Sequence, residues 1–156
     1  MRRIKRFGLL VAVSFCLFGL LSCMTVMKAE AGDYIGEYCW NFTITVDGTQ
    51  VSGRIQLGIS HLGGGHYLCS GIIAVTDPVV FQLATHGNVE FIGDKIIITL
   101  SVQGRTYDSS GGYTIGIDML TIALDPQTLN GTIEGIGVYS DGTELSEGTV
   151  SYTTCQ

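Results

Sequence analysis

The chain has 156 residues, with 22 glycines, only two prolines and a formal net charge of −6 at pH 7. The positive charge is concentrated at the N-terminus, so residues 32–156 hold three basic and 13 acidic side chains and carry a formal net charge of −10. Binding to nucleic acid or to anionic lipid needs clustered Lys and Arg, so this composition excludes a nucleic-acid partner. About 125 residues fit one domain.

The N-terminal segment has the layout of an export signal. Four basic residues within the first six, the last of them Arg6, precede an uninterrupted apolar run from Phe7 to Leu21. This run is shorter than the roughly 20 residues that a membrane-spanning helix needs, and it matches the apolar part of a signal peptide. The sequence therefore predicts export, and the expected locations are the bacterial periplasm, the outer membrane or the extracellular space.

Two processing sites compete, and both remain open. Ala29-Glu30-Ala31 has the small-x-small pattern of ordinary signal peptidase, which would make residues 1–31 the signal peptide and 32–156 the mature domain. Leu20-Leu21-Ser22-Cys23 resembles the bacterial lipobox, which would remove residues 1–22 and leave a lipidated Cys23 on a short tether. A lipid at Cys23 would be the only link to a membrane that we expect.

Segments of alternating apolar and polar residues, separated by turn residues, fill the rest of the chain. A loop is expected over residues 104–112. A break could interrupt the fourth segment at His86-Gly87. The alternation slips near Met119-Leu120, which predicts a β-bulge. The predicted strands are Ile35–Val46, Val51–Ser60, Tyr67–Val75, Val80–Ile92, Lys95–Val102, Tyr113–Leu124, Leu129–Tyr139 and Glu147–Thr154.

These strands predict an all-β fold, because no window has helical periodicity. They predict a single eight-stranded, antiparallel, up-and-down barrel, because closing the sheet removes its exposed edge strands. A two-sheet β-sandwich is the alternative. The chain resembles the lipocalin, avidin and fatty-acid-binding class of meander barrels in architecture. It departs from the Gly-x-Trp motif that opens the first strand of lipocalins, because three residues separate Gly36 from Trp40. The resemblance implies a small ligand held in the mouth of the barrel.

Strand parity suggests how the cysteines of the barrel domain are used. Cys39 and Cys155 both lie on the polar faces of their strands, and the first and last strands of a closed meander are neighbours, so we predict a disulfide bond between them. Cys69 shares a face with Tyr67 and Ile73 and is expected to be a buried free thiol. A catalytic role for Cys69 is the alternative.

Candidate ligand-binding residues are the aromatic side chains of the predicted strands together with one carboxylate. The aromatic side chains could line an apolar pocket, or they could simply fill the barrel as core. Asp118 would have a raised pKa and could act on a ligand if it faces inward, and it would be an ordinary surface residue if it faces outward. The tentative binding set is Tyr38, Trp40, Phe42, Tyr67, Phe81, Phe91, Tyr113 and Asp118, with Tyr139 as a further aromatic candidate.

No catalytic constellation is predicted, and no metal or cofactor is expected. His61 and His66 flank the Gly63–Gly65 turn and could ligate a metal with a carboxylate, but two histidines in one loop are more often solvated. Glu134 is expected to face outward, and no second carboxylate has the spacing of an acid–base pair. The phosphate, dinucleotide and nucleophile-elbow motifs are absent from the sequence.

Three functional hypotheses follow. The first is a non-enzymatic exported barrel that binds a small apolar or amphipathic ligand in the cell envelope. The second is a structural or interaction protein with a side-chain-filled barrel and a protein partner of unknown identity. The third is an enzyme with a lipocalin-like barrel that uses Asp118 or a histidine. The volume left inside the barrel distinguishes the first hypothesis from the second.

Overall fold

The structure is a computed structural model that describes residues 32–107, 113–139 and 142–156, and for residues 104–107 and 113–115 it describes the backbone alone. The N-terminal segment, with its predicted signal and both processing sites, lies outside the described residues. No helix in the described part of the chain is both long and apolar enough to cross a membrane.

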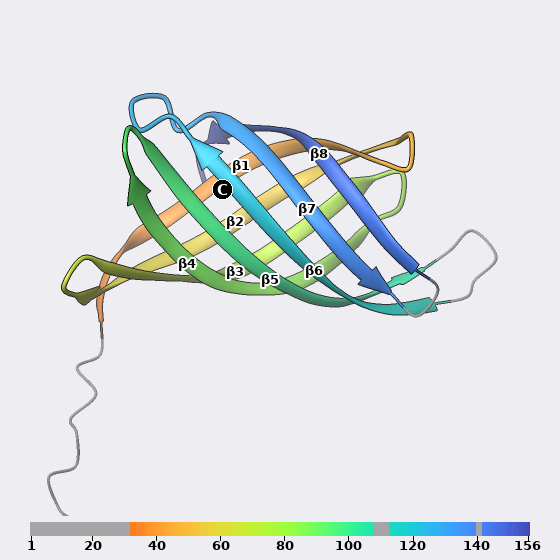
Figure 1. Ribbon diagram of the computed structural model, residues 1–156, viewed down its shortest axis with the longest axis horizontal. Coiled ribbons are helices and arrows are strands. Elements are labelled where there is room, and N and C mark those ends of the chain that lie inside the picture. Colours follow the sequence, from red (N-terminus) through yellow and green to blue (C-terminus); the bar gives the residue numbers. More distant parts are fainter. Residues whose placement is uncertain (1–31, 108–112, 140–141) are drawn as a thin grey trace, which may run out of the picture. The chain divides into compact units, whose positions relative to one another are not determined.

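Eight strands form one closed barrel in which each strand is antiparallel to the next, and β1 pairs with β8 to close the sheet (Figure 1). This confirms the predicted all-β meander barrel and excludes the sandwich. The strands are β1 (Asp33–Val46), β2 (Thr49–Gly63), β3 (His66–Asp77), β4 (Phe81–Ile92), β5 (Lys95–Tyr107), β6 (Tyr113–Leu124), β7 (Gly131–Tyr139) and β8 (Gly142–Thr153).

The connections divide the barrel into two ends, visible at opposite sides of Figure 1. The β2–β3, β4–β5 and β6–β7 connections lie at one end, which we call the Trp40 end. The β1–β2 and β3–β4 connections lie at the opposite end, which we call the Asp118 end. The two ends differ in how completely side chains fill them.

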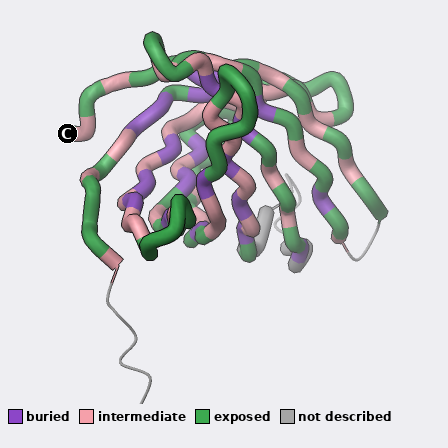
Figure 2. The backbone as a smooth tube through the Cα atoms, turned by 60° about the vertical axis from the view of Figure 1, so that its left-hand side comes forward, coloured by how far each residue is buried: buried purple, intermediate pink, exposed green. Residues whose placement is uncertain are grey.

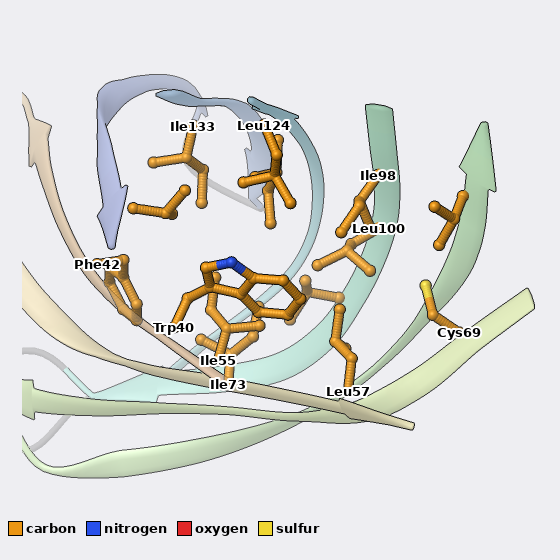
Figure 3. Packing of buried hydrophobic residues seen from close by; sticks show 14 of the residues in the cluster. Trp40, Phe42, Ile55, Leu57, Cys69, Ile73, Ile98, Leu100, Leu124 and Ile133 are labelled. Atoms are coloured by element: carbon orange, nitrogen blue, oxygen red, sulfur yellow. The ribbon is translucent and has the colours of Figure 1, made fainter. Parts of the chain in front are cut away.

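Inward-facing side chains from all eight strands form the core, and burial alternates along the strands (Figure 2). This period of two is what a pleated strand with one buried face requires. Trp40 lies amid the apolar side chains of the core (Figure 3). The largest fully buried side chains are Trp40, Ile55, Leu57, Ile98, Leu100, Ile122, Leu124 and Ile133.

A hydrogen bond from Trp40 ties the β6–β7 connection to the core. The indole Nε1 of Trp40 donates to the backbone oxygen of Leu129 at 2.8 Å, across 89 residues of sequence. Leu129 adopts a left-handed conformation with φ of 57°. The same connection is ordered by Asp125, whose Oδ1 accepts hydrogen bonds from the backbone N–H groups of Gln127 and Thr128. Trp40 therefore both fills its end of the barrel and holds the connection above it.

The disulfide bond between Cys39 and Cys155 lies at the seam where the barrel closes, which confirms its prediction. The two Cα atoms are 5.3 Å apart, and the bond encloses a sequence separation of 116 residues. Cys69 is a buried free cysteine, as predicted, and burial raises the pKa of its thiol to about 11. A thiol with so high a pKa is a poor nucleophile near neutral pH, which argues against a catalytic role.

The predicted bulge near Met119-Leu120 is wrong. The pairing of β6 with β5 and with β7 runs through these residues without a shift in register. The apolar alternation slips because Ile117 and Met119 are exposed on the outer face while Asp118 lies on the inner face. The break considered at His86-Gly87 is also wrong, since β4 continues through it.

Several predicted strand ends are wrong as well. Strand β5 continues to Tyr107, so the loop expected over residues 104–112 begins too early. Strand β8 begins at Gly142 rather than at Glu147, and β7 begins at Gly131 rather than at Leu129. The first part of β8 was missed because its inward-facing positions are polar, and so the apolar alternation that marks a half-buried strand is lost there.

Candidate functional site

A cavity of about 190 Å³ occupies the Asp118 end of the barrel. Apolar side chains form its floor and most of its wall, and a polar wall is contributed by β6, β7 and β8. The apolar lining consists of Phe42, Ile44, Val46, Val51, Ile55, Ile73, Val75, Phe81, Leu83, Val102, Leu120 and Ile133, and the remaining lining residues are Asp118, Gly137, Tyr139, Glu144 and Ser146. The barrel is thus filled at the Trp40 end and hollow at the Asp118 end.

Two carboxylates lie in one row across the polar wall. Asp118 of β6 pairs in register with Gly137 of β7, which in turn pairs with Glu144 of β8. Both carboxylate side chains therefore project from positions on either side of a glycine that has no side chain of its own. The hydroxyl of Tyr139 donates a hydrogen bond to Oδ1 of Asp118 at 2.8 Å.

Glycines make this arrangement possible. A Cβ atom at Gly137 would lie 2.5 Å from Oδ1 of Asp118 and 2.5 Å from Cε2 of Tyr139, which is too close for either contact. A Cβ atom at Gly116 would overlap the ring of Tyr139. The ring of Tyr139 therefore lies over two glycine positions. Because glycine has no side chain, the hydroxyl of Tyr139 can reach Asp118.

Asp118 is half-buried, and its environment changes its acidity. Desolvation by burial raises the pKa of its carboxyl group above the ordinary value of 3.8, and the hydrogen bond from Tyr139 partly offsets this by lowering the pKa. Burial dominates because the ionised form loses more hydration than one hydrogen bond restores. Asp118 thus faces inward, the orientation in which the sequence makes it a candidate ligand-binding group.

The raised pKa has a consequence for stability. At neutral pH the ionised Asp118 is less favourable in the folded than in the unfolded chain, so Asp118→Asn should be more stable than the wild type. The advantage should shrink as the pH falls through the raised pKa and should vanish well below 3.8, where Asp118 is protonated in both states. Asparagine keeps an oxygen that can accept the hydrogen bond from Tyr139. Urea unfolding at several pH values measures this difference.

Glu134→Gln is the matched control for that measurement. Glu134 lies on the outer face of β7 and is exposed, as predicted, so this variant removes one acidic charge without changing the cavity. Its stability relative to the wild type should not share the pH dependence of Asp118→Asn. A stability loss in Asp118→Asn at neutral pH would contradict the inward, desolvated placement of Asp118.

The tentative binding residues are divided between the two ends. Phe42, Phe81 and Asp118 line the cavity. Trp40 stacks with Tyr38 at a centroid distance of 6.2 Å, and neither lines the cavity. Tyr67 meets Phe91 edge-on at 5.5 Å, with Phe91 63% exposed. The side chain of Tyr113 lies outside the described residues. The structure thus brings three of the eight residues together at the cavity.

The histidine pair lies away from the cavity, at the Trp40 end. The ring of His61 packs against Tyr67 with a centroid distance of 4.8 Å, and His66 is exposed. Among the described side chains, no three His, Cys, Asp or Glu residues are grouped so that they could hold a metal ion.

Glu144 and Ser146 line the cavity but are not among the residues that the sequence patterns predict. Both occupy even-numbered, inward-facing positions of β8, in phase with the buried Val150. Extending the alternation backwards from Val150 would have placed them inside the barrel.

Comparison of the chain with protein-family models, with curated proteins and with solved structures gave no match. The chain is an eight-stranded closed antiparallel meander barrel without a family assignment.

Proposed function

We propose that this protein is a non-enzymatic binding protein that holds a small apolar or amphipathic ligand in the cavity at the Asp118 end of the barrel. The main support for this proposal is that side chains fill the two ends of the barrel unequally. Buried side chains pack the Trp40 end, whereas the Asp118 end keeps a cavity with an apolar floor. Small-molecule sites have this character, being concave and mostly apolar with a few polar groups that orient the ligand.

The size of the cavity limits the ligand. Ligand pockets commonly have volumes of about 300–1,000 Å³, and an apolar cavity of about 150 Å³ is large enough for benzene. A volume of about 190 Å³ therefore suits one aromatic ring or a short alkyl chain. A larger molecule would have to leave part of itself outside the barrel.

The test is to fill the cavity from within. Leu83 lines the cavity, and its neighbour Gln82 on the same strand is exposed. Leu83→Trp should abolish the binding of 2-phenylethanol measured by calorimetry, because the indole takes the space of the ligand. Gln82→Trp adds the same side chain to the outer face and should bind as the wild type does. Val51→Phe serves as a second filling variant if Leu83→Trp fails to fold.

Equal binding by Leu83→Trp, Gln82→Trp and the wild type would place the probe elsewhere and contradict the proposal. Failure of the wild type to bind 2-phenylethanol and its amine and carboxylate counterparts would also contradict it. Loss of binding only in the variants that fill the cavity is the result we expect.

A second candidate, an interaction protein, is favoured by one observation on the outer surface. Five large apolar side chains are 44–67% exposed on three adjacent strands, and their positions adjoin through the pairs Ile117–Val138, Met119–Ile136 and Ile136–Leu145. Contiguous exposed apolar surface often marks an interaction site. A partner bound there would contact the outside of the barrel, so the Leu83→Trp variant would still bind it.

We also propose that the protein acts outside the cytoplasm, in the periplasm, at the outer membrane or extracellularly. The basic and apolar N-terminal segment supports this, and so does the disulfide bond, since disulfides persist in oxidising compartments. The intact mass of the protein from its native host would distinguish a chain that begins at Gly32 from one that begins at a lipidated Cys23.

A further inference from the structure

The chemistry of the polar wall narrows the class of ligand. The polar side chains that face the cavity are two carboxylates, one phenol and one hydroxyl, from Asp118, Glu144, Tyr139 and Ser146. The described lining contains no basic side chain. Of the described basic residues, Arg54 donates a hydrogen bond to the backbone oxygen of Thr154, and Lys95 begins β5 at the Trp40 end.

We propose that the cavity selects a small amine, with its apolar group in the floor of the cavity and its ammonium group against Asp118 and Glu144. This inference rests on the proposed function, because it names the ligand class of the same cavity. The two carboxylates occupy register positions on opposite sides of Gly137, and both line the cavity. The ring of Tyr139 covers Gly137 itself, so the head group would lie on the cavity side of this ring, at the wall that both carboxylates line.

An ammonium group fits the hydrogen-bonding capacity of this wall. An ionised carboxylate accepts several hydrogen bonds and donates none, whereas an ammonium group donates three and accepts none. The hydroxyl of Tyr139 occupies one acceptor site on Oδ1 of Asp118, and further lone pairs of the carboxylate remain. An amine would therefore add donors for the acceptor sites of Asp118 that Tyr139 leaves open.

Desolvation of Asp118 supports the same ligand class. Burial raises the pKa of Asp118 because the ionised carboxyl group loses hydration without gaining a cation among the described neighbours. A bound ammonium group would supply that charge and stabilise the ionised form. A carboxylate ligand would place a third negative charge beside Asp118 and Glu144, and like charges so close together repel.

Three probes with one phenyl ring and different head groups test the inference. They are 2-phenylethylamine, 2-phenylethanol and 3-phenylpropionate, titrated calorimetrically into the full protein at neutral pH. The amine should bind about ten- to hundredfold more tightly than the alcohol, as expected for hydrogen bonds to a charged group, and the carboxylate should bind most weakly.

Variants assign the preference to the polar wall. Asp118→Asn and Glu144→Gln should each reduce the affinity for the amine and leave that for the alcohol nearly unchanged. Glu134→Gln, which removes an exposed outer carboxylate, should change neither affinity by more than about twofold. This control excludes a general effect of net charge, which salt screens strongly at exposed sites.

The outcomes separate this inference from the proposed function. Equal affinities for the amine and the alcohol, both lost in Leu83→Trp, would overturn the selection of amines while the binding function stands. An amine preference that survives in both Asp118→Asn and Glu144→Gln would also overturn it. Binding of none of the three probes would remove the inference together with the proposed function.

Discussion

Replacing Trp40 by alanine should lower the free energy of unfolding by about 3–5 kcal/mol, among the largest effects of any single substitution in this barrel. Trp40 is 1% exposed and lies in the core, so its removal leaves a large cavity. The substitution also removes the donor to the backbone oxygen of Leu129, which loses its hydrogen bond at the Trp40 end. Urea unfolding followed by circular dichroism measures the loss.

Trp40→Phe separates the two contributions. It keeps an aromatic ring in the core but cannot donate to Leu129, so it should cost less than alanine, about 1–2 kcal/mol. Circular dichroism is needed because Trp40 is the only tryptophan of the chain, and its fluorescence disappears in both variants. A loss below about 1 kcal/mol in Trp40→Ala would show that Trp40 does not hold this end of the barrel together.

Breaking the disulfide bond should cost up to about 4–5 kcal/mol in the chain-entropy model. The bond closes a loop with a sequence separation of 116 residues, so it restricts the unfolded chain strongly. Cys155→Ser is the cleaner variant, because Cys39 is completely buried and a serine there would bury a hydroxyl group. The free energy of unfolding of Cys155→Ser, compared with that of the oxidised wild type, measures the effect.

Reductant provides the control for the disulfide. The reduced wild type should be about as unstable as Cys155→Ser, and reductant should not destabilise Cys155→Ser further, because Cys69 is a free thiol. Equal stability of the oxidised and reduced wild type would mean that the sheet alone closes the barrel at the β1–β8 seam.

Much of the fold could be predicted because the signals were local and periodic. Strand parity placed Cys39 and Cys155 on matching faces, and closure of the meander then made their strands neighbours, as the structure has them. The hydrogen bond from Trp40 to Leu129 could not be predicted in this way. It joins residues 89 positions apart and depends on the conformation of the β6–β7 connection.

The candidate site is where the sequence patterns failed. Glu144 and Ser146 are polar at inward-facing positions, which concealed the first part of β8. Asp118 also faces inward between two exposed apolar residues, which looked like a bulge. Both errors arise because the cavity wall departs from the apolar-inside rule, and such departures are expected where a protein keeps polar groups for binding.

The polar wall also lowers the stability of the folded barrel, as binding sites commonly do. A half-buried carboxylate with a raised pKa is less favourable than an amide of the same shape at neutral pH. Gly116 and Gly137 contribute no side-chain packing, and the space that they leave lets Tyr139 reach Asp118. Stability exchanged for a shaped, polar cavity is the usual compromise at functional sites.

The proposed function requires that the Asp118 end of the barrel is hollow and accepts a ligand. The most direct test is a titration of 2-phenylethanol followed by NMR of the isoleucine, leucine and valine methyl groups. Saturable shifts should be confined to methyl groups that line the cavity, such as those of Ile44, Val51 and Leu120, with little change at Leu57 and Leu100 in the filled end. Shifts limited to the exposed Ile117, Ile136 and Leu145, or no saturable shifts at all, would contradict the claim.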